Sequence, residues 1–473
     1  MANEHDRLLH LLRRTTYGPT PALVAEATRL GRAAWLEAQL APAALRDPEG
    51  DAVLARFPAL SLPTPEVRRR NDAGTLEPWR LMVSLGQAAI GRAIWSRRQL
   101  LEVMVDFWSN HFNVTCPSDD VWDCRHTLDA DVLRPLAFGR FADLLPAVTA
   151  HPAMLRYLGN VSSTKAAPNE NLGRELLELH TVGVGAGYAE RDVLDSARIL
   201  TGLSVDWTTG VFTYRSRSHW TGGVRVLGFT HPNTDADGRG VLAAYLDHLA
   251  HHPATARRLA LKLATRFVAD DPPAGLVDRL AATYLAHGTA IAPVLRELFA
   301  SAEFMAAPDA KVRRPFETVV ATVRALGFRQ AARGTAELEG LYWALDDQGN
   351  QPYAWPQPDG YPDRASAWAS SAGALARWNT TLGIAAGWWP KGFTSTSLRA
   401  LLPRTRPATH GQLVAALGQR LLQRPLPSAH VAAVCEFLGV TARTPLRADS
   451  AVLGWRLPYV VALVLDGPTH VLR

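Results

Sequence analysis

The sequence predicts a mainly α protein with many helices and one small antiparallel β-hairpin insert. Apolar residues recur at helical spacing along most of the 473-residue chain. Strict apolar–polar alternation is confined to residues 205–230. The composition, 47% hydrophobic and 20% charged, is typical of a folded globular protein and excludes wholesale disorder.

The chain divides by pattern into five consecutive segments, and we expect them to form one large domain. They are the N-terminal helices (1–75), a helical core with acidic and histidine motifs (76–204), the hairpin insert (205–237), a continuation of the helical core (238–344), and a proline-rich aromatic loop with C-terminal helices (345–473). We find no internal repeat that would indicate a solenoid.

The helical segments are bounded by prolines and glycines. Residues 77–112 predict one or two long helices, and residues 126–157 predict shorter helices broken near Gly139 and Pro152. Residues 238–326 are almost wholly helical in pattern. Because proline is favoured at the first helical position, we expect helices to begin at Pro253 and Pro315.

Two further segments are not helical in pattern. The run VFTYRSRSHW (211–220) alternates, and VRVLGF (224–229) follows Gly222–Gly223, so we expect these two runs to pair as one hairpin. The run QPYAWPQPDGYPDRASAW (351–368) combines prolines with aromatic residues. It predicts an ordered loop that either lines a pocket or simply covers the core.

Composition also excludes several classes of protein. Three cysteines without a CxxC pair exclude a disulfide framework and a thiolate zinc site. The 50 basic and 44 acidic residues give a dispersed net charge of +6, so we expect no nucleic-acid partner. Only four basic residues are lysines, which we attribute to a GC-rich genome: Lys165, Lys262, Lys311 and Lys391.

No segment of the sequence predicts a membrane anchor. The longest late apolar run, Leu457–Leu465, is far shorter than the roughly 20 residues of a membrane-spanning helix. The first 20 residues alternate charged and apolar side chains, which is unlike a secretory signal. We therefore expect a cytoplasmic protein that does not bind membranes.

The first candidate functional segment is NENLGRELLELHTVG (169–183). At ~100° per residue, Arg174, Glu175 and Glu178 share a narrow helical face, where two carboxylates can bind a cation or move protons. A solvated amphipathic helix is the alternative. His180 points away from the glutamates unless the helix unwinds at 181–183, where Gly183 makes a helix end plausible.

The second candidate segment is LEVMVDFWSNHFNV (101–114), in which Glu102, Asp106 and Asn110 share one face. Its other faces are apolar, so the helix should be buried. Its carboxylates then need partners, because an unpaired buried charge is costly. His111 lies on the apolar side near the helix end, where it is either a hydrogen-bonded core residue or a ligand.

Neither segment matches the metal motifs HExxH or ExxH, and the chain has no GxSxG motif, P-loop or dinucleotide fingerprint. Nucleotide cofactors are therefore not expected. A divalent metal held by carboxylate and imidazole groups is the cofactor that these residue types favour.

Several longer stretches resemble one bacterial family, domain of unknown function 1800. The stretches that carry the resemblance are LLRRTTYGPT (11–20), FWSNHF (107–112), HPAMLRYLGN (151–160), NENLGRELLELHTVGV (169–184), HPATARRLALKLATRFVADDPP (252–273), KVRRPFE (311–317) and WPQPDGYPD (355–363). The resemblance implies a largely helical bacterial protein without an established activity. It also implies a sulfatase-like partner protein, because the genes of the two families are often neighbours.

Two functions remain open from the sequence. The first is an enzyme whose pocket holds a divalent metal between Glu175, Glu178, His180 and His111, with Arg174 orienting a carboxylate or an anionic substrate. The second is a non-catalytic helical partner or maturation protein, in which the same polar residues form a salt-bridge network. Convergence of the glutamates and histidines around a cavity would favour the enzyme. The sequence names no substrate.

Overall fold

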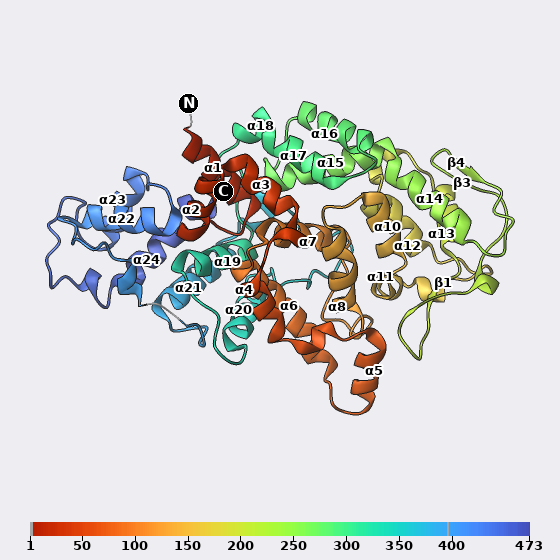
Figure 1. Ribbon diagram of the computed structural model, residues 1–473, viewed down its shortest axis with the longest axis horizontal. Helices are drawn as coiled ribbons and strands as arrows, with labels where there is room; N and C mark the ends of the chain where they lie inside the picture. The colour runs from red at the N-terminus through yellow and green to blue at the C-terminus, as the bar shows by residue number, and fades with distance from the viewer. Residues whose placement is uncertain (1–2, 395–396) are drawn as a thin grey trace.

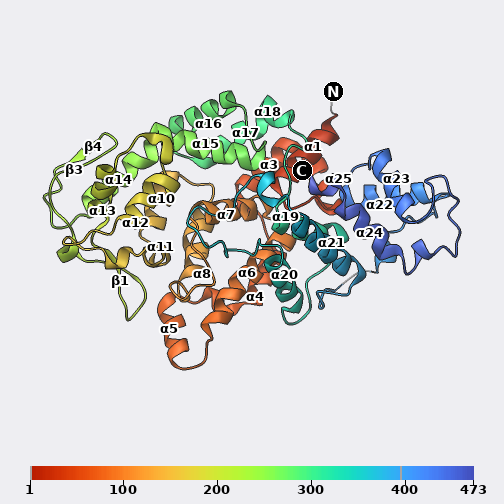
Figure 2. The same ribbon diagram turned by 180° about the vertical axis from the view of Figure 1, so that it is seen from behind.

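The computed structural model describes residues 3–394 and 397–473 and is mainly helical, as the sequence predicts. The molecule is elongated, with the β-strands at one end and the helices α22 (His410–Leu422), α23 (Ser428–Phe437) and α24 (Leu457–Asp466) at the other (Figure 1). Helix α7 (Gln99–His111) runs through the middle, and the view from behind shows the same order reversed from left to right (Figure 2). Within the described ranges, none of the helices combines the length and the apolar character needed to cross a bilayer.

The N-terminal part is wholly helical. Its α-helices are α1 (Glu4–Thr15), α2 (Pro21–Leu30), α3 (Arg32–Leu40), α4 (Pro48–Ala55), α5 (Thr64–Asp72), α6 (Pro78–Trp95) and α7 (Gln99–His111). The region predicted for residues 77–112 is therefore two helices, α6 and α7.

The next part consists of shorter helices. They are α8 (Arg125–Thr127), α9 (Arg134–Leu136), α10 (Phe141–Thr149), α11 (Pro152–Tyr157), α12 (Glu170–Glu175) and α13 (Glu190–Leu200), with π-helical turns at Leu128–Leu133 and Leu176–His180. The predicted breaks are confirmed, because Gly139 lies between α9 and α10 and Pro152 begins α11.

The remaining helices form the second half of the chain. They are α14 (Arg239–His251), α15 (Pro253–Phe267), α16 (Ala274–Ala286), α17 (Ile291–Ala300), α18 (Ala302–Met305), α19 (Pro315–Leu326), α20 (Ala336–Asp346), α21 (Ser371–Ala386), α22 (His410–Leu422), α23 (Ser428–Phe437), α24 (Leu457–Asp466) and α25 (Pro468–Val471). As predicted, Pro253 and Pro315 begin α15 and α19, where a missing N–H costs no helical hydrogen bond.

The β-structure differs from the predicted single hairpin. Strand β1 (Leu203–Val205) pairs with β2 (Phe212–Tyr214), and β3 (Val224–Val226) pairs with β4 (Phe229–His231), both antiparallel. The expected strand at 211–220 is cut short by a 3₁₀ turn at Ser216–Ser218. The β3–β4 turn contains Leu227 and Gly228, both at positive φ (45° and 84°), as a tight two-residue hairpin turn requires.

Helix α7 lies at the centre of the core. Leu100, Met104 and Trp108 are fully buried along it, and the Trp108 indole N–H donates to the Ala137 carbonyl at 2.9 Å. Of its predicted polar stripe, Glu102 is buried, Asp106 and Asn110 are half-buried, and all three have partners. Glu102 pairs with Arg134 at 2.5 Å, and Asn110 exchanges two hydrogen bonds with the backbone of Tyr361.

The aromatic loop packs along this stripe and forms one wall of a cavity. Tyr353 and Tyr361 from the loop line it together with Glu102, Asp106 and Asn110 of α7. Gly360 allows the close approach, because its φ is +75° and a Cβ would collide with the Asn110 carbonyl. The volume is about 40 Å³, which has room for water but not for a drug-sized ligand.

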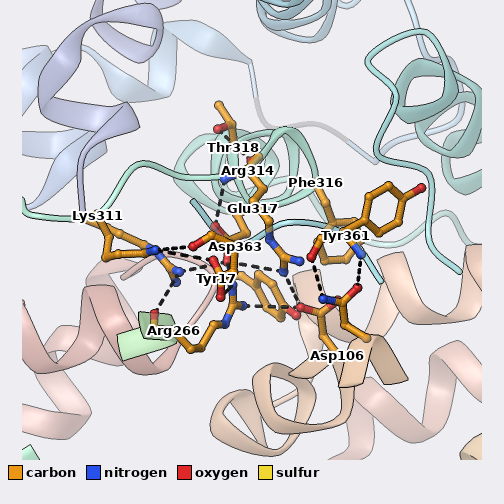
Figure 3. A network of polar contacts seen from close by, with 12 residues as sticks. Tyr17, Asp106, Arg266, Lys311, Arg314, Phe316, Glu317, Thr318, Tyr361 and Asp363 are labelled. Carbon is orange, nitrogen blue, oxygen red and sulfur yellow. Dashed lines mark hydrogen bonds and ion pairs between the residues drawn. The ribbon is translucent and has the colours of Figure 1, made fainter. Parts of the chain in front are cut away.

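A buried ionic network joins segments that are far apart in the sequence (Figure 3). At its centre the Glu317 carboxylate, 1% exposed, forms ion pairs with Arg266 at 2.5 Å, Arg473 at 3.2 Å and Arg314 at 3.7 Å. Arg266 and Arg314 also pair with Asp106 of α7.

The network continues into the loop. Asp363 pairs with Arg266 at 3.7 Å and with Lys311 at 3.6 Å, and Lys311 pairs with Asp270 at 2.5 Å. Although burial alone would raise the pKa of Glu317, its three arginine partners hold that pKa well below the ordinary value of 4.5. The carboxylate is therefore ionised at neutral pH, and its charge is compensated.

We predict that Glu317→Gln destabilises the protein by about 3–5 kcal/mol, because it leaves buried guanidinium groups without their counter-charge. The folded-state pKa is depressed, so the stabilisation is complete above the unfolded-state pKa of about 4.3 and is lost as the pH falls below it. Guanidinium chloride unfolding at pH 7 and pH 3.5 measures both effects, and the difference between variant and wild type should shrink at pH 3.5.

The matched control is Glu77→Gln, which removes one exposed ion pair with Arg80 at 2.6 Å. We expect it to cost less than about 1 kcal/mol at either pH. Equal losses from the two substitutions would show that the buried network contributes no more than a surface pair.

Candidate functional site

The segment 169–183 is held close to α13 and ends in an altered helical turn. A Cβ on Gly173 would lie 2.8 Å from the backbone nitrogen of Ala197, so only glycine permits this approach of α12 to α13. The π-helical turn Leu176–His180 follows, and the helix ends at Thr181. Gly183 has φ +90° and donates its N–H to the Leu177 carbonyl at 2.9 Å. The predicted unwinding after His180 is therefore confirmed.

The structure brings His180 and His111 together in the core, each 1% exposed. The ring centroids are 6.4 Å apart, and His111 Nε2 lies 3.1 Å from the His180 carbonyl oxygen. Because a carbonyl only accepts, His111 carries its proton on Nε2 and leaves a lone pair on Nδ1. Among the described residues, neither His111 Nδ1 nor His180 Nε2 has a hydrogen-bond partner.

The acidic residues of this segment lie toward the surface. Arg174 pairs with Glu190 at 2.6 Å, with Glu170 at 3.5 Å and with Glu178 at 3.6 Å. Half-buried Glu175 forms no ion pair or hydrogen bond with the residues that the structure describes. Burial and neighbouring Glu178 raise the pKa of Glu175 above its ordinary value.

The five predicted site residues therefore form two groups. His111 lies against His180, and Arg174 lies against Glu178 with Glu175 beside them. Across residues 3–394 and 397–473, no three His, Cys, Asp or Glu side chains are grouped so that they could hold a metal. Metal binding by Glu175, Glu178, His180 and His111 stays a prediction.

A lysine that was not a candidate from the sequence lies within electrostatic reach of the two histidines. Lys262 on α15 is half-buried, and its amine has no hydrogen bond or ion pair with the described part of the chain. Burial and the nearby Arg258 lower the pKa of Lys262 to about 7, against a weaker opposite influence from Asp363 and Asp359.

Lys262 and Arg258 in turn act on the histidines. Burial and then these two cations lower the pKa of His180 to about 3, and burial and the same cations lower that of His111 well below its ordinary value. Both imidazoles are therefore neutral at pH 7. Arg258 is fixed by donating to the Leu179 carbonyl at 3.2 and 3.3 Å. This positive field opposes a divalent cation at the two histidines.

One signal for Lys262 was present in the sequence. The chain has 50 basic residues and only four lysines, so a lysine inside a helix otherwise supplied with arginine is unusual. Arginine cannot lose its proton near pH 7, whereas a buried lysine can. Because the scarcity of lysine was attributed to genome composition, Lys262 was not among the candidate site residues.

The fold and the site define a helical protein with a buried ionic core and a half-buried amine within electrostatic reach of two adjoining neutral histidines. The chain belongs to the family described as "Protein of unknown function (DUF1800)", whose profile matches residues 10–472. The resemblance noted in the sequence is thus confirmed. No curated protein and no solved structure matches the chain.

We predict that Glu175→Gln and Glu178→Gln leave the fold intact. Among the residues that the structure describes, Glu175 has no partner to lose, and burial already raises its pKa; Glu178 loses one screened ion pair, worth less than about 1 kcal/mol. If the metal prediction is right, both substitutions remove bound metal.

Thermal melts and inductively coupled plasma mass spectrometry on the same untagged preparations test this prediction. A melting temperature unchanged within about 2 °C, with metal present in the wild type and lost in both variants, is the expected pair of results. Wild-type protein that contains no stoichiometric metal and gains none on titration would contradict metal binding. A sharp fall in melting temperature would instead assign the glutamates to a structural network.

Proposed function

We propose that this protein is an enzyme in which the amine of Lys262 reacts with, or takes a proton from, a small carbonyl compound. The observation that supports the proposal is the half-buried Lys262 amine, which has no hydrogen bond or ion pair in the described ranges, has a pKa near 7 and influences the pKa of His111 and His180. Strongly perturbed pKa values next to a specific charge partner are typical of catalytic sites.

The chemistry follows from the state of the amine. Near pH 7 about half of the Lys262 side chains are neutral and have a free lone pair, which is the form that attacks a carbonyl carbon. Attack gives a carbinolamine, and loss of water from it gives an imine. Ordinary lysines, which titrate near 10.4, are almost wholly protonated at this pH.

The surrounding groups suit this reaction. His111 Nδ1 presents a lone pair, and His180 Nε2 is buried without a partner in the described ranges, so both can orient a polar substrate. Glu175, whose pKa is raised, can supply a proton to the departing water. Asp359 influences the pKa of both Lys262 and Glu175, so the two groups share one electrostatic environment.

The proposal is tested by trapping the imine. Protein incubated with glyoxylate and sodium cyanoborohydride, then mapped by peptide mass, should carry the label on Lys262 at pH 7. The rate should rise with pH around a midpoint near 7, because only the neutral amine reacts. Exposed Lys165 and Lys391 serve as internal controls and should react more than tenfold more slowly at pH 7.

A variant shows whether Lys262 is labelled preferentially because its pKa is lowered or only because its amine is accessible. Arg258→Gln removes a like charge and should move the Lys262 midpoint upward, because the ammonium form is then less disfavoured. Preferential labelling of Lys391 at pH 7, or a Lys262 midpoint above about 9 in the wild type, would contradict the proposal.

A second candidate function is that of a non-catalytic partner, and exposed aromatic residues favour it. Trp388 and Trp455 are 55% and 68% exposed, and both rings contact Tyr459 on α24. Exposed aromatic clusters often mark protein interfaces. Co-purification with the sulfatase-like protein expected as a partner, lost in Trp455→Ala, would support this function, whereas independent elution of the two proteins would count against it.

A further inference from the structure

A second cavity lies between α19 and the start of α21, away from the Lys262 site. Its volume is about 170 Å³. Its lining includes Arg313, Thr318, Gln348, Trp368, Ser370 and Arg377. Two of these are arginines, and within the described ranges no aspartate or glutamate lines the cavity.

Arg313 is almost entirely buried, with 4% of its surface exposed. Its Nη1 donates to the His470 carbonyl, whereas its buried Nε has no hydrogen-bond partner among the residues that the structure describes. Burial and the neighbouring Arg13 and Arg473 lower the pKa of Arg313 well below its ordinary value, against a weaker opposite influence from Glu317. The charges that act on this guanidinium group are therefore mostly cationic, and an anion would relieve their repulsion.

Arg377 forms no hydrogen bond or ion pair within the described part of the chain, and its Nε is buried. The carboxyl group near it, Asp466, compensates it poorly, because burial raises the pKa of Asp466 to about 7. At neutral pH this carboxyl is only partly ionised. In the described ranges, both cations of the cavity thus retain donor groups that can pair with a ligand.

The start of α21 adds a third attraction for negative charge. This helix runs from Ser371 to Ala386, and Ser370 caps it by accepting from the Gly373 N–H at 3.0 Å. The first-turn amides of a helix have no acceptor within the helix, and its dipole favours an anion there. Two arginines at a helix N-terminus are a typical arrangement for binding phosphate groups.

We propose that this cavity binds a phosphate-class oxyanion, held by Arg313, Arg377 and the N-terminus of α21. The volume exceeds that of a phosphate ion, so the ligand is either the free ion or the phosphate group of a small metabolite. The site is independent of the Lys262 amine and does not rest on the proposed enzyme function.

Two substitutions at one residue give a matched test. Asparagine, aspartate and serine are equally good helix caps, so Ser370→Asn and Ser370→Asp should both preserve α21. Only Ser370→Asp adds a negative charge to the cavity, where it pairs with Arg377 and repels an anion. Arg377→Gln removes one cation without breaking a contact in the described structure, and Arg447→Gln, at an exposed pair with Asp449, is the control for a lost surface charge.

Isothermal titration and thermal melts with sodium phosphate, against sodium chloride at equal ionic strength, provide the measurement. We expect saturable phosphate binding by the wild type, Ser370→Asn and Arg447→Gln, and at least tenfold weaker binding by Ser370→Asp and Arg377→Gln. Phenyl phosphate binding tenfold more tightly than inorganic phosphate would identify a phosphate ester as the ligand; equal binding would identify the free ion.

The proposal is overturned if the wild type shows no saturable binding up to about 10 mM of either compound, which corresponds to an affinity weaker than any specific site. It is also overturned if Ser370→Asp binds phosphate as tightly as Ser370→Asn does. Neither result would affect the labelling of Lys262.

Discussion

The ion pairs of Glu317 are the constraint on which the rest of the structure depends. One carboxylate joins α15, α19 and Arg473, and its partners reach Asp106 on α7 and Asp363 in the aromatic loop. Each charge is tolerated in the interior only while the others are in place. The network therefore fixes the relative register of segments that lie more than 200 residues apart, which apolar packing alone would leave less specific.

The same network also fixes the two helices that carry Lys262 and His111 of the proposed site. Arg266 lies one helical turn after Lys262 on α15, and Asp106 lies on α7 a little more than one turn before His111. The ion pair between Arg266 and Asp106 therefore fixes the position of the Lys262 amine relative to the His111 imidazole. A reactive amine has to keep its surroundings dry and its neighbours in place to hold a lowered pKa. The ionic core provides the rigid base for that arrangement.

Local features of the fold could be predicted from the sequence, because they depend on neighbouring residues. The prolines that begin α15 and α19, the break at Gly139 and the end of the helix after His180 are of this kind. The pairing of the strands could not be predicted, because the alternation of apolar and polar residues is the same for one hairpin as for two. Only the Ser216–Ser218 turn, which the sequence pattern does not reveal, separates the two hairpins. The carboxylates of α7 were predicted to need partners, but nothing local identifies Arg314 as one.

The site was predicted only in part. His111 and His180 do lie together. Lys262, in contrast, belongs to no sequence motif, and it can be recognised as a candidate only from the tertiary fold, which brings α15 near α7 and the segment 169–183. Its lowered pKa has a practical consequence for handling the protein. Cyanate, which accumulates in urea solutions, adds to neutral amines and not to ammonium groups. Cyanate at urea concentrations that leave the protein folded should therefore carbamylate Lys262 before the other lysines of the chain, and a folded sample stored with aged urea would lose the proposed reactive amine.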